Sequence, residues 1–259
     1  MHFYPRVLLS LKKRGLLSES DTLLVVAGGS ADRQSMLDAG LTKVTISNID
    51  HQAGESQFAP FEWRQLDGEQ LDLADNSFDW VVIHAGLHHM AIPARGVCEM
   101  FRVASKGILC MEARDSLLMR MAIKLGLTAE YELEPAFLSG GTVGGYRNGP
   151  IPNYVFRWTE REFEKTVLSY APTHQHTFFY EYGYNVPLQR FAMARSVVYR
   201  SVGVALSFLT RFAEIVIPKQ GNQFAFGALK NTSCQPWLTE SLEFNGEYLD
   251  RKYDKGRYQ

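Results

Sequence analysis

The sequence predicts an α/β fold, a doubly wound and mostly parallel sheet with helices on both faces. Leu23–Val26 is an apolar run without polar alternation, which is typical of a strand buried on both faces. Phe78–His84 is a second clear strand, preceded by the turn residues 75–77. Between residues 20 and 126 strand and helix patterns alternate, as they do in βαβ units. We therefore expect an α/β core over residues 20–126.

Length and composition limit the class of protein. The 259 residues suit one large domain or a domain with an insertion, and the 46% hydrophobic and 21% charged contents are those of a globular protein. The net charge of -1 gives no reason to expect a nucleic-acid partner. Three widely spaced cysteines indicate a reducing compartment, so we expect a cytoplasmic protein. Residues 1–20 lack the order of a signal peptide and predict a helix lying on the domain, and no transmembrane segment is expected.

Small residues follow the first strand, at Ala27, Gly28, Gly29 and Ser30. They predict a tight turn where backbone approaches a ligand, with Ser30 capping the next helix. A helix N-terminus offers free N–H groups and the positive end of its dipole. A turn that only packs against its neighbours remains the alternative.

Polar residues end the next two strands. The second strand covers residues 44–50, and Asn48 or Asp50 stands roughly 20 residues after the glycine turn, a spacing suited to ribose hydroxyls. The alternative is a plain turn residue at a strand end. Residues 63–66 form the predicted third strand, followed by Asp67 and Gly68.

The remaining elements are predicted from pattern and turn chemistry. A turn over residues 85–90 leads into a helix with Pro93 in its first turn, and the fifth strand, residues 107–111, ends at Glu112. The next helix is predicted to begin at Asp115 and stop at Gly126. It is predicted to bury Leu117, Leu118, Met121, Ala122 and Leu125.

The second half of the chain is less regular. Residues 127–157 carry five glycines and predict a lid or binding loop. Residues 158–230 complete the sheet, with a helix after residue 158, a strand over 174–182, a helical insertion over 187–217 and a last strand over 222–230 that pairs antiparallel with 174–182. Residues 231–259 are a C-terminal extension, wrapped or mobile.

The most specific stretch is DNSFDWVVIHAGLHH, residues 75–89, followed by EMFRV at 99–103. It resembles the fourth strand, turn and following helix of class I S-adenosylmethionine-dependent methyltransferases, in the group with an FD-apolar strand and a Leu-His-His turn. The resemblance covers residues 20–126. It implies a Rossmann-like sheet of seven strands with an antiparallel last strand. It also implies S-adenosylmethionine as cofactor and S-adenosylhomocysteine as product.

The resemblance also implies which residues bind the cofactor. Residues 27–31 would lie under its methionine and ribose, Asn48 would take the place of the ribose-binding acid, Asp67 with Gly68 would meet the adenine amino group, and His84 would lie near the methionine. The chain departs from the family at Val25, Ala27, Ala31 and Asn48. Asp50 is therefore a rival on the same strand face. Asp32 is a candidate for the missing negative charge.

Methyl transfer needs the nucleophile, methyl carbon and sulfur in line, and a neutral acceptor also needs a base. His88 is the predicted base, and the alternative is a His pair that only packs or hydrogen-bonds the turn. Glu112 would bind a hydroxyl, orient His88 or pair with Arg114. His174 and His176 share a strand face, but surface histidines are favoured, so no metal site is predicted. For the arginines of 187–217 a solvated helix face or intramolecular pairing is favoured, with a phosphate or an acidic membrane face as the alternative.

These observations predict methyl transfer to a hydroxyl or amine of a small molecule or glycan/natural-product precursor, in a crevice closed by residues 127–157 and 187–217. The oligomeric state stays open. A degenerate methyltransferase-like binding or scaffold protein is the alternative. A nicotinamide oxidoreductase is a third hypothesis, which the absence of GxGxxG spacing disfavours.

Overall fold

The computed structural model describes residues 2–50, 54–185 and 197–252. Its central sheet has seven strands in the spatial order β3-β2-β1-β4-β5-β9-β8. Only β9 runs antiparallel to its neighbours, so the predicted seven-stranded, mostly parallel sheet with an antiparallel last strand is confirmed. The strands are β1 (Leu23–Val26), β2 (Val44–Asn48), β3 (Glu62–Gln65), β4 (Phe78–His84), β5 (Ala104–Ala113), β8 (Thr177–Gly183) and β9 (Gln223–Leu229).

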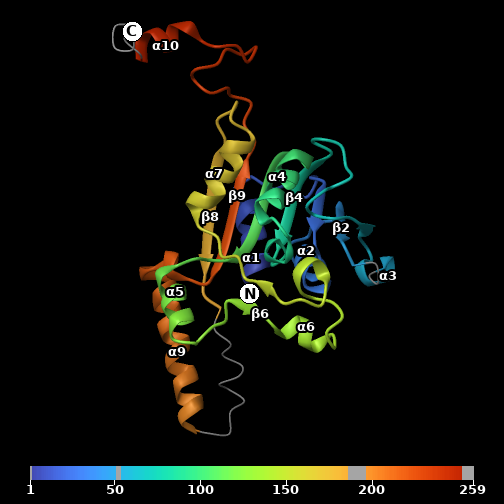
Figure 1. Ribbon diagram of the computed structural model, residues 1–259, viewed down its shortest axis with the longest axis vertical. Helices are drawn as coiled ribbons and strands as arrows, with labels where there is room; N and C mark the ends of the chain where they lie inside the picture. The colour runs from blue at the N-terminus through green and yellow to red at the C-terminus, as the bar shows by residue number, and fades with distance from the viewer. Residues whose placement is uncertain (1, 51–53, 186–196, 253–259) are drawn as a thin grey trace.

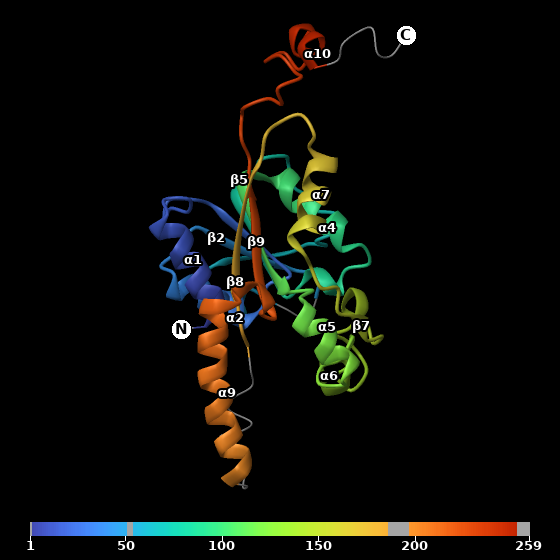
Figure 2. The ribbon, with the colours of Figure 1, turned by 90° about the vertical axis from the view of Figure 1, so that its left-hand side faces the viewer.

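Helices cover both faces of this sheet, with α1 and α2 on one side and α4 and α7 on the other (Figures 1 and 2). The helices are α1 (Phe3–Lys13), α2 (Ser30–Asp38), α3 (Glu55–Phe58), α4 (Pro93–Val103), α5 (Leu117–Lys124), α6 (Glu134–Leu138), α7 (Glu160–Tyr170), α9 (Val197–Val216) and α10 (Gly246–Lys252). Three 3-10 turns, η1 (Leu87–His89), η2 (Tyr146–Asn148) and η3 (Pro218–Gln220), and a small hairpin of β6 (Tyr131–Glu132) and β7 (Asn153–Tyr154) complete the described elements.

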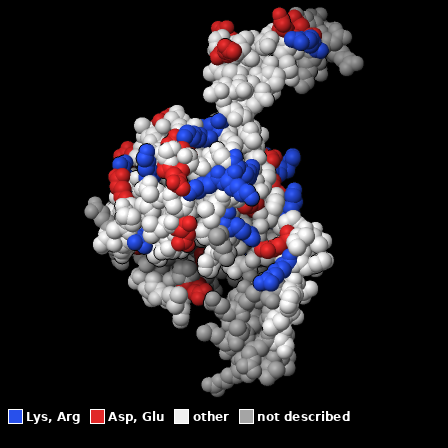
Figure 3. Space-filling view, turned by 180° about the vertical axis from the view of Figure 1, so that it is seen from behind, with Lys and Arg blue, Asp and Glu red and all other residues white. Residues whose placement is uncertain are grey.

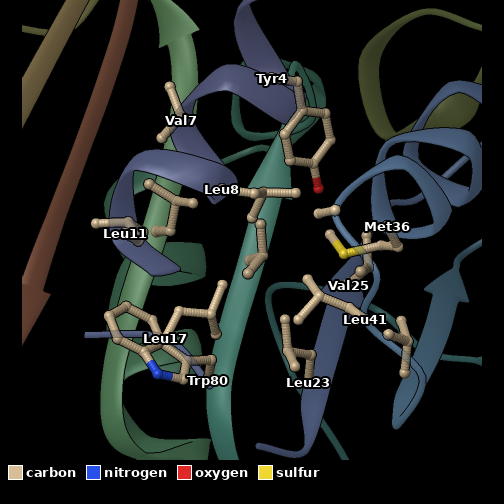
Figure 4. Packing of buried hydrophobic residues seen from close by; sticks show 14 of the residues in the cluster. Tyr4, Val7, Leu8, Leu11, Leu17, Leu23, Val25, Met36, Leu41 and Trp80 are labelled. Carbon is tan, nitrogen blue, oxygen red and sulfur yellow. The ribbon is translucent and has the colours of Figure 1, made fainter. Parts of the chain in front are cut away.

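The first strand shows why an unbroken apolar run predicts burial on both faces. Leu23 and Val25 belong to the hydrophobic core under α1 and α2, whereas Leu24 and Val26 belong to the core under α4 and α7. Successive side chains of a strand point to opposite faces, so all four are needed. In Figure 4 the apolar side chains of α1 pack over β1 and β4, which confirms the predicted helix lying on the domain.

Several predicted boundaries were shifted. The fifth strand begins at Ala104 rather than residue 107, because α4 leads directly into it. The third strand is Glu62–Gln65, and the eighth begins at Thr177 rather than residue 174. The predicted insertion 187–217 is represented by α9, while Arg190 and Arg195 lie outside the described residues.

Two capping and burial predictions were wrong. The N-cap of α5 is Ser116, not Asp115, since the Ser116 hydroxyl accepts from Met119 N–H at 3.2 Å. The side chains predicted to be buried on this helix are 42–69% exposed at Leu117, Leu118, Met121 and Leu125, and Ala122 is only half-buried. Ser116 bonds to the backbone of η3 at 3.0 Å, and this attachment leaves the apolar face of α5 outward. An amphipathic pattern indicates a helix but not the surface that covers it.

The two late helices extend away from the body of the molecule. α9 projects from one end of the long axis and α10 lies at the opposite end (Figures 1 and 2). The described part of the C-terminal extension, residues 231–252, therefore does not wrap around the domain. Among the described residues, no helix is long and apolar enough to cross a membrane. On the face seen from behind, Lys and Arg side chains lie among Asp and Glu side chains (Figure 3).

Candidate active site

A cavity of about 260 Å³ lies at the carboxyl ends of the first strands. Ala27 follows β1, Asn48 ends β2, and Asp67 and Gly68 follow β3, and all four line the cavity. Ligands of open α/β sheets bind at this edge, where loops from adjacent parallel strands meet. The structure therefore brings together four of the predicted cofactor residues, from three separate turns.

Two alanines with left-handed backbone form the floor of this cavity. Ala27 has φ 52° and Ala85, which follows β4, has φ 51°. This conformation costs a non-glycine residue about 1–2 kcal/mol. The neighbouring Gly86 is packed so closely that a Cβ there would lie 2.8 Å from the Ala27 Cβ. The turns after β1 and β4 thus touch where they line the cavity.

The polar side chains at the cavity are already engaged. Asn48 Nδ2 donates to the Gly28 carbonyl at 3.0 Å, and its Oδ1 accepts from Asp50 N–H at 3.0 Å. Asn48 therefore ties the first turn to the residues after β2. Asp67 Oδ1 accepts from Glu69 N–H at 2.9 Å, and its Oδ2 lies 3.2 Å from Arg147 Nη2.

Arg147 comes from the predicted lid. With Pro135, Gly144 and Asn148 it lines the cavity, so part of the segment 127–157 contributes to the cavity wall. The segment is not one loop, because it contains α6, η2 and the β6-β7 hairpin. The α9 residue Glu214 lines a second cavity, of about 570 Å³, beside α1.

A second group of predicted residues lies on the other side of the first turn. Asp32 is buried, with Oδ2 accepting from Gly29 N–H at 2.8 Å and Oδ1 3.7 Å from His84 Nδ1. The His84 ring packs against the Tyr4 ring in a tilted arrangement, with centroids 4.8 Å apart. Burial and, next, the Asp32 carboxylate raise the pKa of Tyr4. His84 lines the second cavity and not the first, and Asp32 contacts the protein's own turn.

Residues of the glycine turn have different roles in the structure. Gly29, not Ser30, is the N-cap of α2, so the capping prediction for Ser30 was wrong. The Asp32 carboxylate, rather than a hydroxyl, takes the N–H of this cap. A Cβ on Gly28 would lie 2.6 Å from Ile46 Cγ2 and 2.9 Å from Val25 Cγ1, so Gly28 is required by core packing.

The two histidines of η1 meet a carboxylate from the lid. His88 is buried, with Nδ1 2.5 Å from Glu112 Oε2 and Nε2 3.2 Å from Glu132 Oε2. His89 Nε2 lies 3.4 Å from the same Glu132 oxygen, and its Nδ1 lies 3.3 Å from the Gly145 carbonyl. We call these four side chains, His88, His89, Glu112 and Glu132, the histidine cluster. His89 also lines the first cavity, so the cluster borders the predicted cofactor site.

Of the three roles predicted for Glu112, its contacts in the structure fit the orientation of His88. It orients His88, and its Oε1 accepts from Leu87 N–H at 2.7 Å. It does not pair with Arg114, whose guanidinium lies 2.8 Å from Glu160. Glu132 was not predicted from the sequence, because it stands in a two-residue strand without a recognisable motif.

The charges of the cluster follow from its burial and contacts. Burial alone would lower the pKa of His88, but Glu112 and then Glu132 outweigh it and raise that pKa to about 10. Burial and the neighbouring His88 lower the pKa of His89. The hydrogen bond from His88 lowers the pKa of Glu132. His88 therefore carries a proton at neutral pH, and its predicted role as base requires that proton to leave first.

The other histidine pair is engaged elsewhere. The rings of His174 and His176 lie 6.4 Å apart, with His174 Nδ1 2.8 Å from the Thr173 hydroxyl and His176 Nε2 3.1 Å from the Ala171 carbonyl. In the described part of the chain, no acidic or cysteine side chain joins them as a third ligand.

Comparisons with known proteins agree with this geometry. Residues 28–111 match the family model described as a methyltransferase domain. A solved SAM-dependent methyltransferase from Archaeoglobus fulgidus is 10% identical, with a TM-score of 0.51, covering 88% of this chain and 94% of its own. One from Mesorhizobium loti is 13% identical, with a TM-score of 0.50, covering 86% and 98%. At these identities the structures establish the shared fold. No curated protein matches the sequence.

Proposed function

We propose that the chain, whose residues 28–111 match a methyltransferase domain, uses S-adenosylmethionine to methylate a hydroxyl or amine of a small molecule or glycan/natural-product precursor in the cytoplasm. One observation supports this proposal above the others. His89 lines the cavity at the strand ends and also belongs to the histidine cluster. The proposed cofactor cavity therefore borders, through His89, a group of side chains that could bind an acceptor and its proton.

The strand-end residues support the placement of the cofactor. Asn48 and Asp67 lie at the ends of neighbouring strands, so they are suited to ribose hydroxyls and to the adenine amino group respectively. Ala27 and Ala85 would lie under the sulfonium end, where backbone permits close approach. Asp50, Asp32 and His84 then support the turns instead of touching the nucleoside, with Asp32 holding the Gly29 N–H.

The transfer itself needs alignment and a route for the acceptor's proton. When bound, the cofactor supplies an electrophilic methyl group on sulfur. The lid residues over the cavity exclude water and hold the acceptor in line with that methyl. The histidine cluster, rather than His88 alone, receives the proton, because His88 is held as an imidazolium between two carboxylates.

Calorimetry with S-adenosylhomocysteine tests the cofactor site. Wild-type protein should bind with saturation. Asp67→Ala should weaken binding at least about tenfold, because it removes the charged group that we propose to hydrogen-bond the ligand. Asp72→Ala removes an exposed carboxylate five positions away and should leave binding unchanged. Absence of wild-type binding at millimolar ligand would refute the proposal.

A binding or scaffold protein remains the second candidate, favoured by the Arg147–Asp67 ion pair that occupies the adenine-side carboxylate. Turnover separates the two candidates. Labelled S-adenosylmethionine, incubated with pools of hydroxyl- and amine-bearing metabolites, should lose its methyl group to an acceptor. Binding of the cofactor without transfer to any pool would favour the scaffold.

A further inference from the structure

Three ligand atoms from two distant parts of the chain converge beside the cofactor cavity. They come from His88 and His89 of η1 and from Glu132 of β6, and one ligand atom of each residue lies within 4.8 Å of the other two. The hairpin that carries Glu132 is held to η1 by Asn153, whose Nδ2 donates to the His88 carbonyl at 3.2 Å. The convergence is therefore supported by neighbouring backbone and not by the three side chains alone.

In each histidine, the hydrogen-bond partner of Nδ1 determines whether Nε2 can present a lone pair to a cation. His89 Nδ1 faces the Gly145 carbonyl, which can only accept, so this nitrogen carries the hydrogen. His88 Nδ1 faces the Glu112 carboxylate in the same way. In the metal-free protein the second proton of His88 lies at Nε2, beside Glu132. A cation that displaces this proton would find the lone pairs of both Nε2 atoms facing Glu132. Histidines that bind metals have this arrangement, with the second ring nitrogen donating to a carboxylate or a carbonyl.

The spacing also fits a cation. With metal–ligand bonds of about 2.0–2.1 Å, tetrahedral geometry separates the ligand atoms by about 3.3–3.4 Å. The Glu132 oxygen lies 3.2 Å from His88 Nε2 and 3.4 Å from His89 Nε2. A dication would balance the two carboxylates of the cluster, Glu112 and Glu132. Three protein ligands would leave a fourth position open, as in catalytic zinc sites.

We propose that His88, His89 and Glu132 bind one divalent transition-metal cation of the zinc type, with Glu112 orienting His88. Imidazole ligands favour such a cation over magnesium or calcium, which prefer oxygen. The cation would join the lid to the turn after β4. Because His89 lines the proposed cofactor cavity, the cation would lie beside that cavity.

The role of the cation in methyl transfer rests on the proposed function, whereas the site itself rests on the cluster. An acceptor hydroxyl would replace the hydroxide at the open position, giving that hydroxide its proton so that it leaves as water. The remaining alkoxide oxygen then forms a bond to the methyl carbon while the sulfur–carbon bond breaks. A metal-bound oxygen is a nucleophile at neutral pH.

Zinc binding by the full chain tests the site. Protein stripped with a chelator is dialysed against Zn²⁺, and the bound metal is counted by mass spectrometry. We expect one Zn²⁺ per wild-type chain and at least about tenfold weaker binding for His89→Gln, Glu132→Gln and Glu112→Gln. The matched control is the double variant His174→Gln/His176→Gln, a histidine pair without a third ligand in the described residues. Circular dichroism confirms that each variant is folded.

Cobalt provides an independent measurement, since Co²⁺ in a four-coordinate site of this kind absorbs visible light strongly. The band should appear with wild-type protein and the control but not with Glu132→Gln. Binding that is absent, or that is lost only in the His174/His176 control, would overturn the site in favour of an imidazolium between two carboxylates. S-adenosylhomocysteine binding is measured on the same samples. Zinc binding without it would refute the proposed function alone, and the reverse result would refute the cation site alone.

Discussion

Arg147→Ala should tighten the binding of S-adenosylhomocysteine. Arg147 lies 3.2 Å from Asp67, the carboxylate that we propose for the adenine, so a ligand must displace this partner. The Arg147 and Asp67 side chains are 53% and 32% exposed. Ion pairs this accessible contribute about 0.2–1 kcal/mol, and removing the competition should lower Kd by about 1.4- to 5-fold.

Titration calorimetry at low ionic strength measures this difference, because salt screens exposed pairs. Arg120→Ala is the matched control. The Arg120 and Asp115 side chains form an ion pair with similar exposed fractions, 58% and 28%, and neither residue lines the proposed cofactor cavity. Combining Arg147→Ala with Asp67→Ala should bring no gain over Asp67→Ala. If Arg147→Ala instead weakens binding, Arg147 closes over the ligand and the competition argument is refuted.

Three further predictions concern packing and charge. Gly68→Ala places a Cβ 2.8 Å from Val26 Cγ1 and against Met90, so it should weaken ligand binding and lower the free energy of unfolding by about 1–3 kcal/mol, whereas Gly54→Ala, with open space around it, should do neither. Leu11→Ala, at a fully buried position of α1, should lower the free energy of unfolding, measured in urea, by about 2–5 kcal/mol. The exposed Leu127→Ala should lower it by about 0.5 kcal/mol or less. An effect of Leu11→Ala below about 1 kcal/mol would contradict the assigned core. In metal-free protein the pKa of His88 is about 10, against an ordinary value of 6.5. The resulting stabilisation is complete below about pH 6.5 and is lost as the pH rises through about 10. Urea unfolding across this range should show a decline in the free energy of unfolding of the wild type and a smaller decline in Glu112→Gln, and equal slopes would contradict the assigned pairing.

Local pattern was sufficient for most of the fold. The apolar run of β1 and the FD-apolar strand β4 are visible without a structure, because burial on both faces requires apolar residues at successive positions. Asn48 and Asp67 could be proposed as cofactor residues from the family resemblance. They line one cavity because parallel strands place their carboxyl ends at one edge of the sheet. The exposed face of α5 could not be predicted, because the same amphipathic pattern forms whether or not a partner surface exists.

The sequence by itself determined the class of fold, the order of the strands along the chain and the residues at their carboxyl ends. Tertiary structure decided which side chains meet. Glu132 and His88 are separated by 44 residues and Arg147 and Asp67 by 80, and neither pair has a local signature. Helix and strand periodicity arises from neighbours a few residues apart, whereas these contacts depend on where the lid folds back over the sheet. For this reason the histidine cluster, and the cation that we propose for it, became visible only in three dimensions.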